Sequence, residues 1–150
     1  NREQAEATAI EFFRKIGQSA QEAGVVFCIE PNPVSYGCDF ITTSAEGRNL
    51  VTKVDHPGFS LHLDAAGMTM SNEDIEQELE KSFPQLCHFH ISEPNLQPIG
   101  SGGVDHALFA STLITQGYDR WFSIEMRAPG DTANVSGIEK ALRTVRNYYL

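Results

Sequence analysis

The chain alternates between stretches with the apolar spacing of a helix and short apolar runs typical of strands. Apolar side chains recur at helical spacing over residues 2–22, and Gly24 ends this predicted helix. Residues 24–31 are rich in β-forming residues and stop at Pro31, which predicts a strand. The chain therefore begins with a helix that leads directly into a strand.

Three further predicted strands alternate with helices along the rest of the chain. Thr43 and Glu46 form a capping-box pattern at the start of a helix that continues to about Val54. The other expected elements are a strand at 59–64, an acidic helix over 72–83 capped by Ser71, a strand at 86–92, a helix at 105–116, a strand at 121–126 and a last helix within 131–149. Because strands that alternate with helices imply right-handed crossovers, the sequence predicts an α/β fold with a parallel sheet.

Each predicted strand ends in one side chain that can bind a metal, and a loop follows it. These side chains are Glu30, Asp64, His90 and Glu125, which follow one another at intervals of 34, 26 and 35 residues. The carboxyl ends of parallel strands meet at one edge of a sheet, so we expect the four side chains to converge there. Three carboxylates and one imidazole favour Mn²⁺ or Mg²⁺, with Co²⁺ or Zn²⁺ as alternatives.

Alternation along a strand puts every second side chain on the same face of the sheet. The residues that precede the four predicted ligands by two positions are Cys28, His62, His88 and Ser123. In a closed barrel these side chains would line the interior just below the ligands. We interpret His62 and His88 as hydrogen-bonded structural histidines, which is the commoner role for a single buried histidine.

Composition narrows the class of protein. The net charge is −9, with 11 Lys and Arg against 20 Asp and Glu, which argues against a nucleic-acid partner. No apolar run approaches the roughly 18 residues of a membrane span. The three cysteines form no CxxC pair and no signal pattern precedes them, so we expect reduced thiols and a cytoplasmic protein. The chain starts without Met inside a helical pattern, which we interpret as a fragment of a larger protein.

Short motifs around the predicted ligands resemble the xylose isomerase-like superfamily of sugar isomerases and epimerases. The motifs are Ile29–Asn32, Leu63–Asp64, His88–Ser92 and Ile124–Glu125, with the glycine-rich segment 100–105 between the last two. The resemblance implies a (β/α)8 TIM barrel of about 250 residues or more. Residues 1–150 would form one domain, the C-terminal half of that barrel with its last four βα units.

The same resemblance implies a metal-dependent enzyme of carbohydrate metabolism that acts on a sugar or sugar phosphate. Glu30 and Glu125 would ligate the metal and also move protons through an enediolate, which requires no nucleotide or flavin. Arg127 follows Glu125 by two residues and is the first candidate for binding the substrate. Asn32 and His106 are further candidates, together with Asn95.

Two positions depart from the ketose 3-epimerase pattern, and several alternatives stay open. Gly67 stands where those enzymes carry a histidine, and Leu96 stands where they carry an arginine, both at positions that hold the substrate. An endonuclease IV-like phosphodiesterase is the first alternative, although Gly67 removes a histidine that it needs. A dehydratase or lyase acting on a polyol or keto acid is the second, and a non-catalytic sugar-binding half-barrel is the third.

An open half-barrel leaves strand edges that need a partner. We expect unpaired edges at about Val25–Glu30 and Phe122–Met126, which are templates for association. We also expect that the helices alone cannot bury the strand residues Phe27, Ile29, Leu61, Leu63 and Phe89. The chain should therefore associate either with a missing N-terminal half-barrel or with a second copy of itself.

Overall fold

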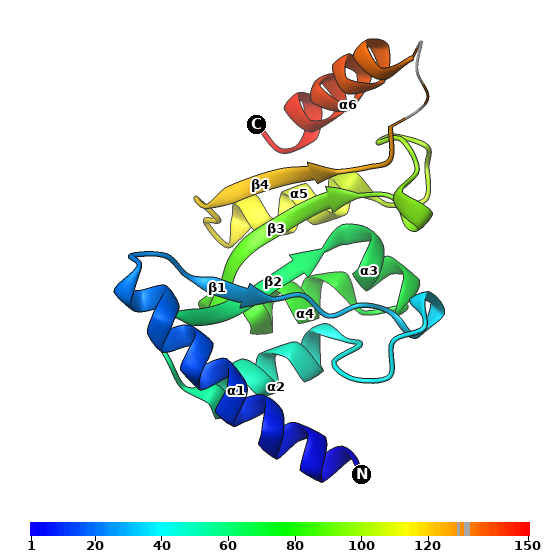
Figure 1. The fold of residues 1–150 in the computed structure, drawn as a ribbon. Coiled ribbons are helices and arrows are strands. Elements are labelled where there is room, and N and C mark those ends of the chain that lie inside the picture. The colour runs from blue at the N-terminus through cyan, green and yellow to red at the C-terminus, as the bar shows by residue number, and fades with distance from the viewer. Residues whose placement is uncertain (129, 131–132) are drawn as a thin grey trace.

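A computed structural model describes residues 1–128, 130 and 133–150 and contains one four-stranded parallel sheet. The strands follow one another in sequence order as β1 (Phe27–Ile29), β2 (Phe59–Asp64), β3 (Leu86–Ser92) and β4 (Trp121–Glu125). All four arrows point the same way in Figure 1, so the carboxyl ends of the strands share one edge. The predicted α/β fold with a parallel sheet is confirmed.

Helices precede, connect and follow the strands. They are α1 (Arg2–Glu22), α2 (Ser44–Val54), α3 (Ala65–Met70), α4 (Ile75–Ser82), α5 (His106–Thr115) and α6 (Asn134–Tyr148), with short 3-10 turns at Val34–Tyr36, Phe83–Gln85 and Pro94–Leu96. The expected last helix within 131–149 corresponds to α6, and residues 131 and 132 lie outside the described part of the chain. Within that part, no helix is both long enough and apolar enough to cross a membrane.

The region between β2 and β3 differs from the prediction. A single acidic helix capped by Ser71 was expected, but Ser71 ends α3 and the side chain of Asp74 caps α4 by accepting from the backbone N–H of Gln77 at 3.1 Å. The additional helix α3 begins directly after β2 because Asp64 accepts from the backbone N–H of Gly67 at 2.6 Å. One strand-end residue thus starts a helix that apolar periodicity did not reveal.

Most of the strand residues that were expected to lack cover are buried. Leu61, Leu63 and Phe89 are at most 1% exposed and belong to the hydrophobic core. The expectation that the helices cannot bury these three residues is therefore wrong, because alternation turns them all toward the helices. The expectation holds for Phe27, which keeps 43% of its surface exposed at the start of β1.

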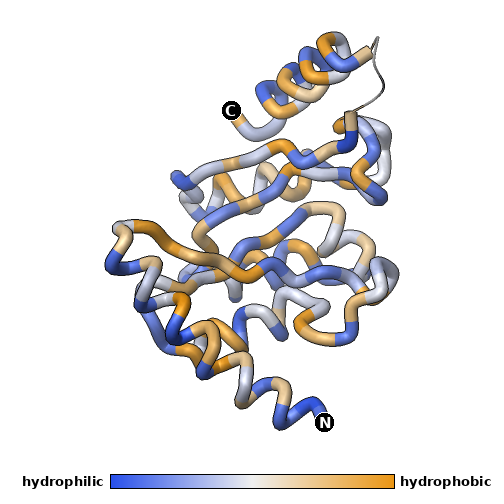
Figure 2. Tube along the Cα trace, in the orientation of Figure 1, coloured by the Kyte–Doolittle hydropathy of each residue, from blue (hydrophilic) through white to orange (hydrophobic). Residues whose placement is uncertain are grey.

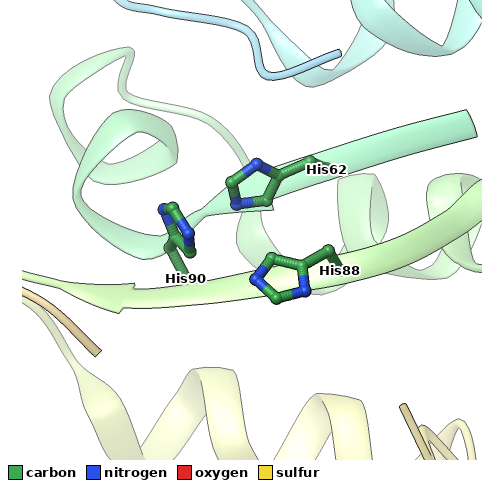
Figure 3. Close-up of side chains that lie close together, drawn as sticks. All are labelled: His62, His88 and His90. Carbon is green, nitrogen blue, oxygen red and sulfur yellow. The ribbon is translucent and has the colours of Figure 1, made fainter. Parts of the chain in front are cut away.

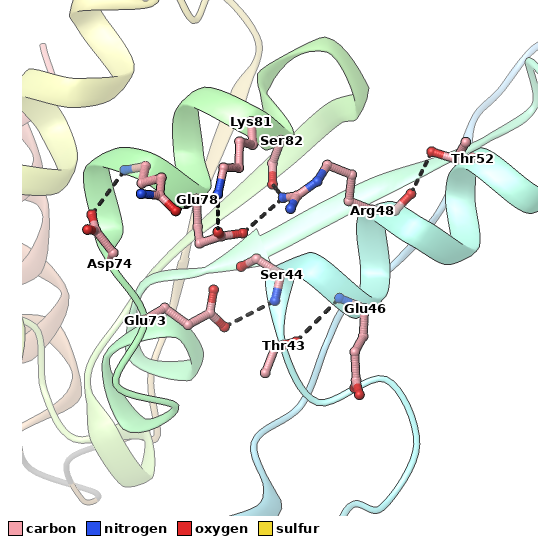
Figure 4. A network of polar contacts seen from close by, with 11 residues as sticks. Thr43, Ser44, Glu46, Arg48, Thr52, Glu73, Asp74, Glu78, Lys81 and Ser82 are labelled. Atoms are coloured by element: carbon pink, nitrogen blue, oxygen red, sulfur yellow. Dashed lines mark hydrogen bonds and ion pairs between the residues drawn. The ribbon is translucent and has the colours of Figure 1, made fainter.

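Polar contacts join α2 to the segment that follows β2. The guanidinium of Arg48 donates to Oε2 of Glu78 at 3.0 Å and to Oγ of Ser82 at 2.9 Å (Figure 4). The backbone N–H of Ser44 donates to Oε1 of Glu73 at 3.0 Å in the same network. These contacts hold the helices on one side of β2 and leave the strand ends free to carry the site.

The outer strands β1 and β4 are the edges of the sheet, as expected. The hydrophobic run that leads into β1 is visible in Figure 2, and Val25 and Val26 in this run are 58% and 51% exposed. Trp121, the first residue of β4, is 81% exposed. Both edges therefore carry apolar surface that the described chain does not cover.

Candidate metal centre

Four side chains from four strands converge at the carboxyl edge of the sheet. Glu30 directly follows β1, Asp64 and Glu125 are the last residues of β2 and β4, and His90 lies in β3. One ligand atom from each lies within 4.8 Å of the others. The structure thus brings together all four residues that the sequence predicts as ligands.

His90 is at the centre of the cluster. Its Nδ1 atom lies 3.4 Å from Oε1 of Glu30, 3.5 Å from Oε2 of Glu125 and 3.9 Å from Oδ2 of Asp64. Parallel pairing of β2 with β3 puts Asp64 beside His90, which explains how residues 26 positions apart share one point. A single nitrogen therefore faces three carboxylates.

Two of the converging atoms have no hydrogen-bond partner. Nδ1 of His90 and Oδ2 of Asp64 are buried and unpaired within the described part of the chain, whereas the other oxygen of Asp64 caps α3. Buried polar atoms are normally paired, so unpaired atoms that face a common point indicate a position suited to binding a ligand. A divalent cation fits this donor set, because it would satisfy a nitrogen lone pair and carboxylate oxygens together.

The pKa values reflect the crowding of negative charge. Burial raises the pKa of Asp64, and the charges of Glu30 and Glu125 raise it further, which outweighs the effect of the Ser92 hydroxyl and the Gly67 N–H. Burial lowers the pKa of His90, but the surrounding carboxylates of Glu30, Glu125 and Asp64 raise it above the usual value. Burial raises the pKa of Glu30, yet the nearby imidazoles of His90 and His62 leave it lowered. The cluster therefore favours positive charge at its centre.

A cavity of about 380 Å³ opens beside the cluster. Its lining combines Glu30 and Glu125 with further polar and apolar side chains, namely Asn32, Tyr36, Asn95, Leu96 and Arg127. Three of the substrate-binding candidates, Arg127, Asn32 and Asn95, thus face one cavity. Sequence reasoning missed Tyr36, whose hydroxyl accepts from the backbone N–H of Asn95 at 2.8 Å and so joins the loops after β1 and β3.

The remaining candidate, His106, belongs to a different part of the structure. Its Nε2 atom lies 3.2 Å from Oε1 of Glu93, and its Nδ1 atom lies 3.0 Å from the hydroxyl of Tyr149. Glu93 is fully buried and also accepts from the backbone N–H groups of Gly100 and Gly103 at 3.0 and 2.9 Å. Sequence reasoning missed Glu93, although its position after the His88–Ser92 strand and before a glycine-rich segment could have indicated it. This arrangement favours a structural role for His106.

Comparisons with known proteins show which proteins this chain is similar to. The family model described as xylose isomerase-like TIM barrel matches residues 1–148. The D-psicose 3-epimerase of Ruminiclostridium cellulolyticum is 27% identical over 74% of this chain and 38% of its own length. The L-ribulose 3-epimerase of Mesorhizobium japonicum is 24% identical over 74% of this chain and 37% of its own length.

Solved structures share the fold. The crystal structure of D-psicose 3-epimerase with D-tagatose from Clostridium cellulolyticum H10 matches 99% of this chain and 58% of its own chain, with a TM-score of 0.88 and 21% identity. The expected architecture of four βα units of a TIM barrel is thereby confirmed. The chain spans less than two thirds of the length of each of these relatives.

Proposed function

Because this chain belongs to the xylose isomerase-like TIM barrel family, we propose that it carries the metal site of a sugar isomerase or epimerase. The convergence of Glu30, Asp64, His90 and Glu125 on one point is the observation that carries this proposal. The curated relatives, which are ketose 3-epimerases, support the reaction class. Since the chain spans about 38% of the first of these relatives, the activity is proposed for the protein to which this chain contributes its four βα units.

The donor set favours Mn²⁺ or Mg²⁺ at the site. Carboxylate oxygens are the ligands that these cations prefer, and one imidazole is compatible with Mn²⁺. A bound divalent cation would polarise the carbonyl and the neighbouring hydroxyl of a sugar. This would acidify the C–H of the carbon that carries the hydroxyl. Co²⁺ and Zn²⁺ can also bind these four ligands, but the oxygen-rich donor set matches them less well than it matches Mn²⁺ or Mg²⁺.

Glu30 and Glu125 are proposed to move the proton. They lie at the ends of the two edge strands and line the same cavity, so a substrate there can meet both carboxylates. The lowered pKa of Glu30, in which burial is outweighed by His90 and His62, keeps this carboxylate ionised and able to accept a proton. One glutamate would take the proton from the carbon next to the carbonyl, and the other would return a proton from the opposite side.

Arg127 and Asn32 are proposed to hold the substrate. Leu96 stands where the ketose 3-epimerase pattern has an arginine, and Gly67 stands where it has a histidine. Arg127 lines the same cavity as Leu96, and its backbone N–H donates to the carbonyl of Leu96 at 2.9 Å. The side chain of Arg127 thus supplies a positive charge to the same cavity as Leu96, where the ketose 3-epimerase pattern has an arginine. This difference favours a substrate with different polar groups from those of the curated relatives.

Proton exchange with solvent tests the proposal. The protein is incubated in D2O with keto sugars such as D-fructose, D-psicose, D-tagatose and L-ribulose, with Mn²⁺ or with a chelator. NMR should detect deuterium at the carbon next to the carbonyl only when Mn²⁺ is present. Exchange that is equally fast with the chelator would refute a metal-dependent mechanism.

The same experiment separates the alternatives. Loss of water from the substrate, seen as a new carbonyl or alkene signal, would assign the site to a dehydratase or lyase. Tight binding of Mn²⁺ and sugar without any exchange would support a non-catalytic sugar-binding half-barrel. Epimerised sugar that contains one deuterium would support the proposed reaction.

A further inference from the structure

Three histidine rings meet on the polar face of the sheet beside the candidate metal centre. His62 lies on β2, and His88 and His90 lie on β3. Their ring centroids are 4.0 Å apart for His62 and His90, 4.9 Å for His62 and His88, and 5.2 Å for His88 and His90. One ring nitrogen of each lies within 4.8 Å of the others, and Figure 3 shows the three rings grouped around a common space.

An irregularity in strand pairing creates this cluster. Leu61 pairs with Leu86, but the register then shifts so that His62 pairs with His88. If the first pairing simply continued, His62 would lie beside Cys87, and His88 would lie beside Leu63 on the other face. The shift therefore turns all three histidines to one face, and such irregularities are common next to functional sites.

The rings carry nitrogen atoms that are free to bind a ligand. Nε2 of His88 lies 2.9 Å from Oγ of Ser123, and this contact orients the ring and leaves Nδ1 unused. Nε2 of His62 is buried, lies 3.6 Å from Oε1 of Glu30 and has no hydrogen-bond partner within residues 1–128, 130 and 133–150. His88 is held as metal-binding histidines typically are, with one nitrogen fixed by a neighbour and the other left for an ion.

We propose that His62, His88 and His90 form a second cation site, built from imidazole nitrogens, that takes Zn²⁺ or Co²⁺. Three nitrogen ligands with one open position suit these ions, whereas Mg²⁺ and Mn²⁺ prefer the carboxylate oxygens of the neighbouring site. His90 belongs to both ligand sets. Loading one site therefore lowers the affinity of the other, because the two cations either compete for His90 or repel each other across its ring.

Titration with Co²⁺ tests the proposal, because the visible absorption of Co²⁺ reports its ligands. A four-coordinate site with three nitrogens absorbs strongly, and a six-coordinate site rich in oxygen absorbs weakly. The protein should show a strong band that saturates at about one Co²⁺ per chain. Mn²⁺ added beforehand should weaken the apparent Co²⁺ affinity that this band reports.

Variants assign the band to its ligands. His88→Gln and His62→Gln each keep a polar side chain. Each should lower the apparent Co²⁺ affinity that the strong band reports by at least tenfold. Glu125→Gln removes a ligand of the other site and should leave the strong band in place. Mn²⁺ binding, followed by electron paramagnetic resonance, should survive in His88→Gln, so failure of this proposal is distinct from failure of the proposed function.

Three results would overturn the proposal. The first is a wild-type protein without the strong band. The second is a band that persists unchanged in both histidine variants, each shown to be folded by circular dichroism. The third is a band that disappears in Glu125→Gln but survives in His88→Gln, because it would then belong to the carboxylate site.

Discussion

Oδ2 of Asp64 lies 3.9 Å from Nδ1 of His90, and neither atom has a hydrogen-bond partner within the described part of the chain. The other carboxylate oxygen of Asp64 accepts from the backbone N–H of Gly67 and caps α3. Asp64 thus combines a structural contact with a proposed ligand atom, and the two roles can be separated by mutation.

Asp64→Asn should impair metal binding more than folding. Asparagine caps helices about as well as aspartate, but its side chain is a neutral and weaker metal ligand. We expect Mn²⁺ affinity to fall at least tenfold, or about 1.4 kcal/mol, with a small change in the free energy of unfolding. Asp64→Ala should lose the cap as well, at a cost of about 1 kcal/mol. Calorimetric titration and urea unfolding measure the two effects, and an asparagine variant with unchanged Mn²⁺ affinity would argue against the ligand assignment.

Glu30→Gln and Glu125→Gln in the intact protein should abolish the proposed proton exchange next to the substrate carbonyl. An amide keeps the shape of the side chain but cannot act as a base, so sugar affinity should fall less than exchange. NMR in D2O measures exchange, with Glu80→Gln on an exposed helical position as the control. Deuterium that appears at the wild-type rate in either variant would remove that glutamate from the mechanism.

Glu93→Ala should destabilise the protein without weakening metal binding at the candidate metal centre. Its carboxylate accepts from Gly100, Gly103 and His106 while fully buried, so alanine leaves several buried donors unpaired. We expect a loss of about 3 kcal/mol in unfolding free energy. Asp105→Ala, which removes only the cap of α5, should cost about 1 kcal/mol. Equal costs in urea unfolding would show that Glu93 does not organise the glycine-rich segment.

The stability of the chain should depend on the ionisation of Glu46. Burial raises the pKa of Glu46, but the hydrogen bonds from Thr42 and the charge of Arg2 outweigh burial and leave the pKa below its usual value. A lowered pKa in the folded state adds stability above the unfolded pKa of about 4.3, and this contribution disappears as pH falls through the folded pKa. Glu46→Gln should therefore be less stable than wild type at pH 7, with a difference that shrinks in acid. Urea unfolding of both proteins from pH 7 down through the folded-state pKa measures this difference. A difference that does not change with pH would contradict the prediction.

The exposed edge at β1 should promote association. Val26 is 51% exposed beside an unpaired parallel strand, where a lysine would discourage pairing with another chain. Sedimentation of the 150-residue chain should detect dimers or larger species, and Val26→Lys should shift them toward monomer. Ile114→Lys, at a 57% exposed position on α5, serves as the matched control. A monodisperse wild-type monomer with a cooperative melt would show that the half-barrel needs no partner.

Local patterns in the sequence were enough to predict the architecture and the four converging residues. Glu30, Asp64, His90 and Glu125 each lie at or near a strand end, and the carboxyl ends of parallel strands must share an edge. Capping chemistry likewise predicted the start of α2 at Thr43, whose side chain accepts from the backbone N–H of Glu46. These features depend on residues close together in the chain, or on a rule that holds for every parallel sheet.

Other features were decided only by tertiary structure, because they depend on contacts between distant residues. The burial of Glu93 results from its contacts with a glycine-rich segment and with His106, and neither contact has a periodic signal. Alternation predicted that His62 and His88 share the face of the proposed ligands, but their direct pairing depends on a register shift between β2 and β3 that alternation does not predict. A shift of one residue changes every neighbour across the strands, so packing between the strands determined which histidines lie side by side next to the candidate metal centre.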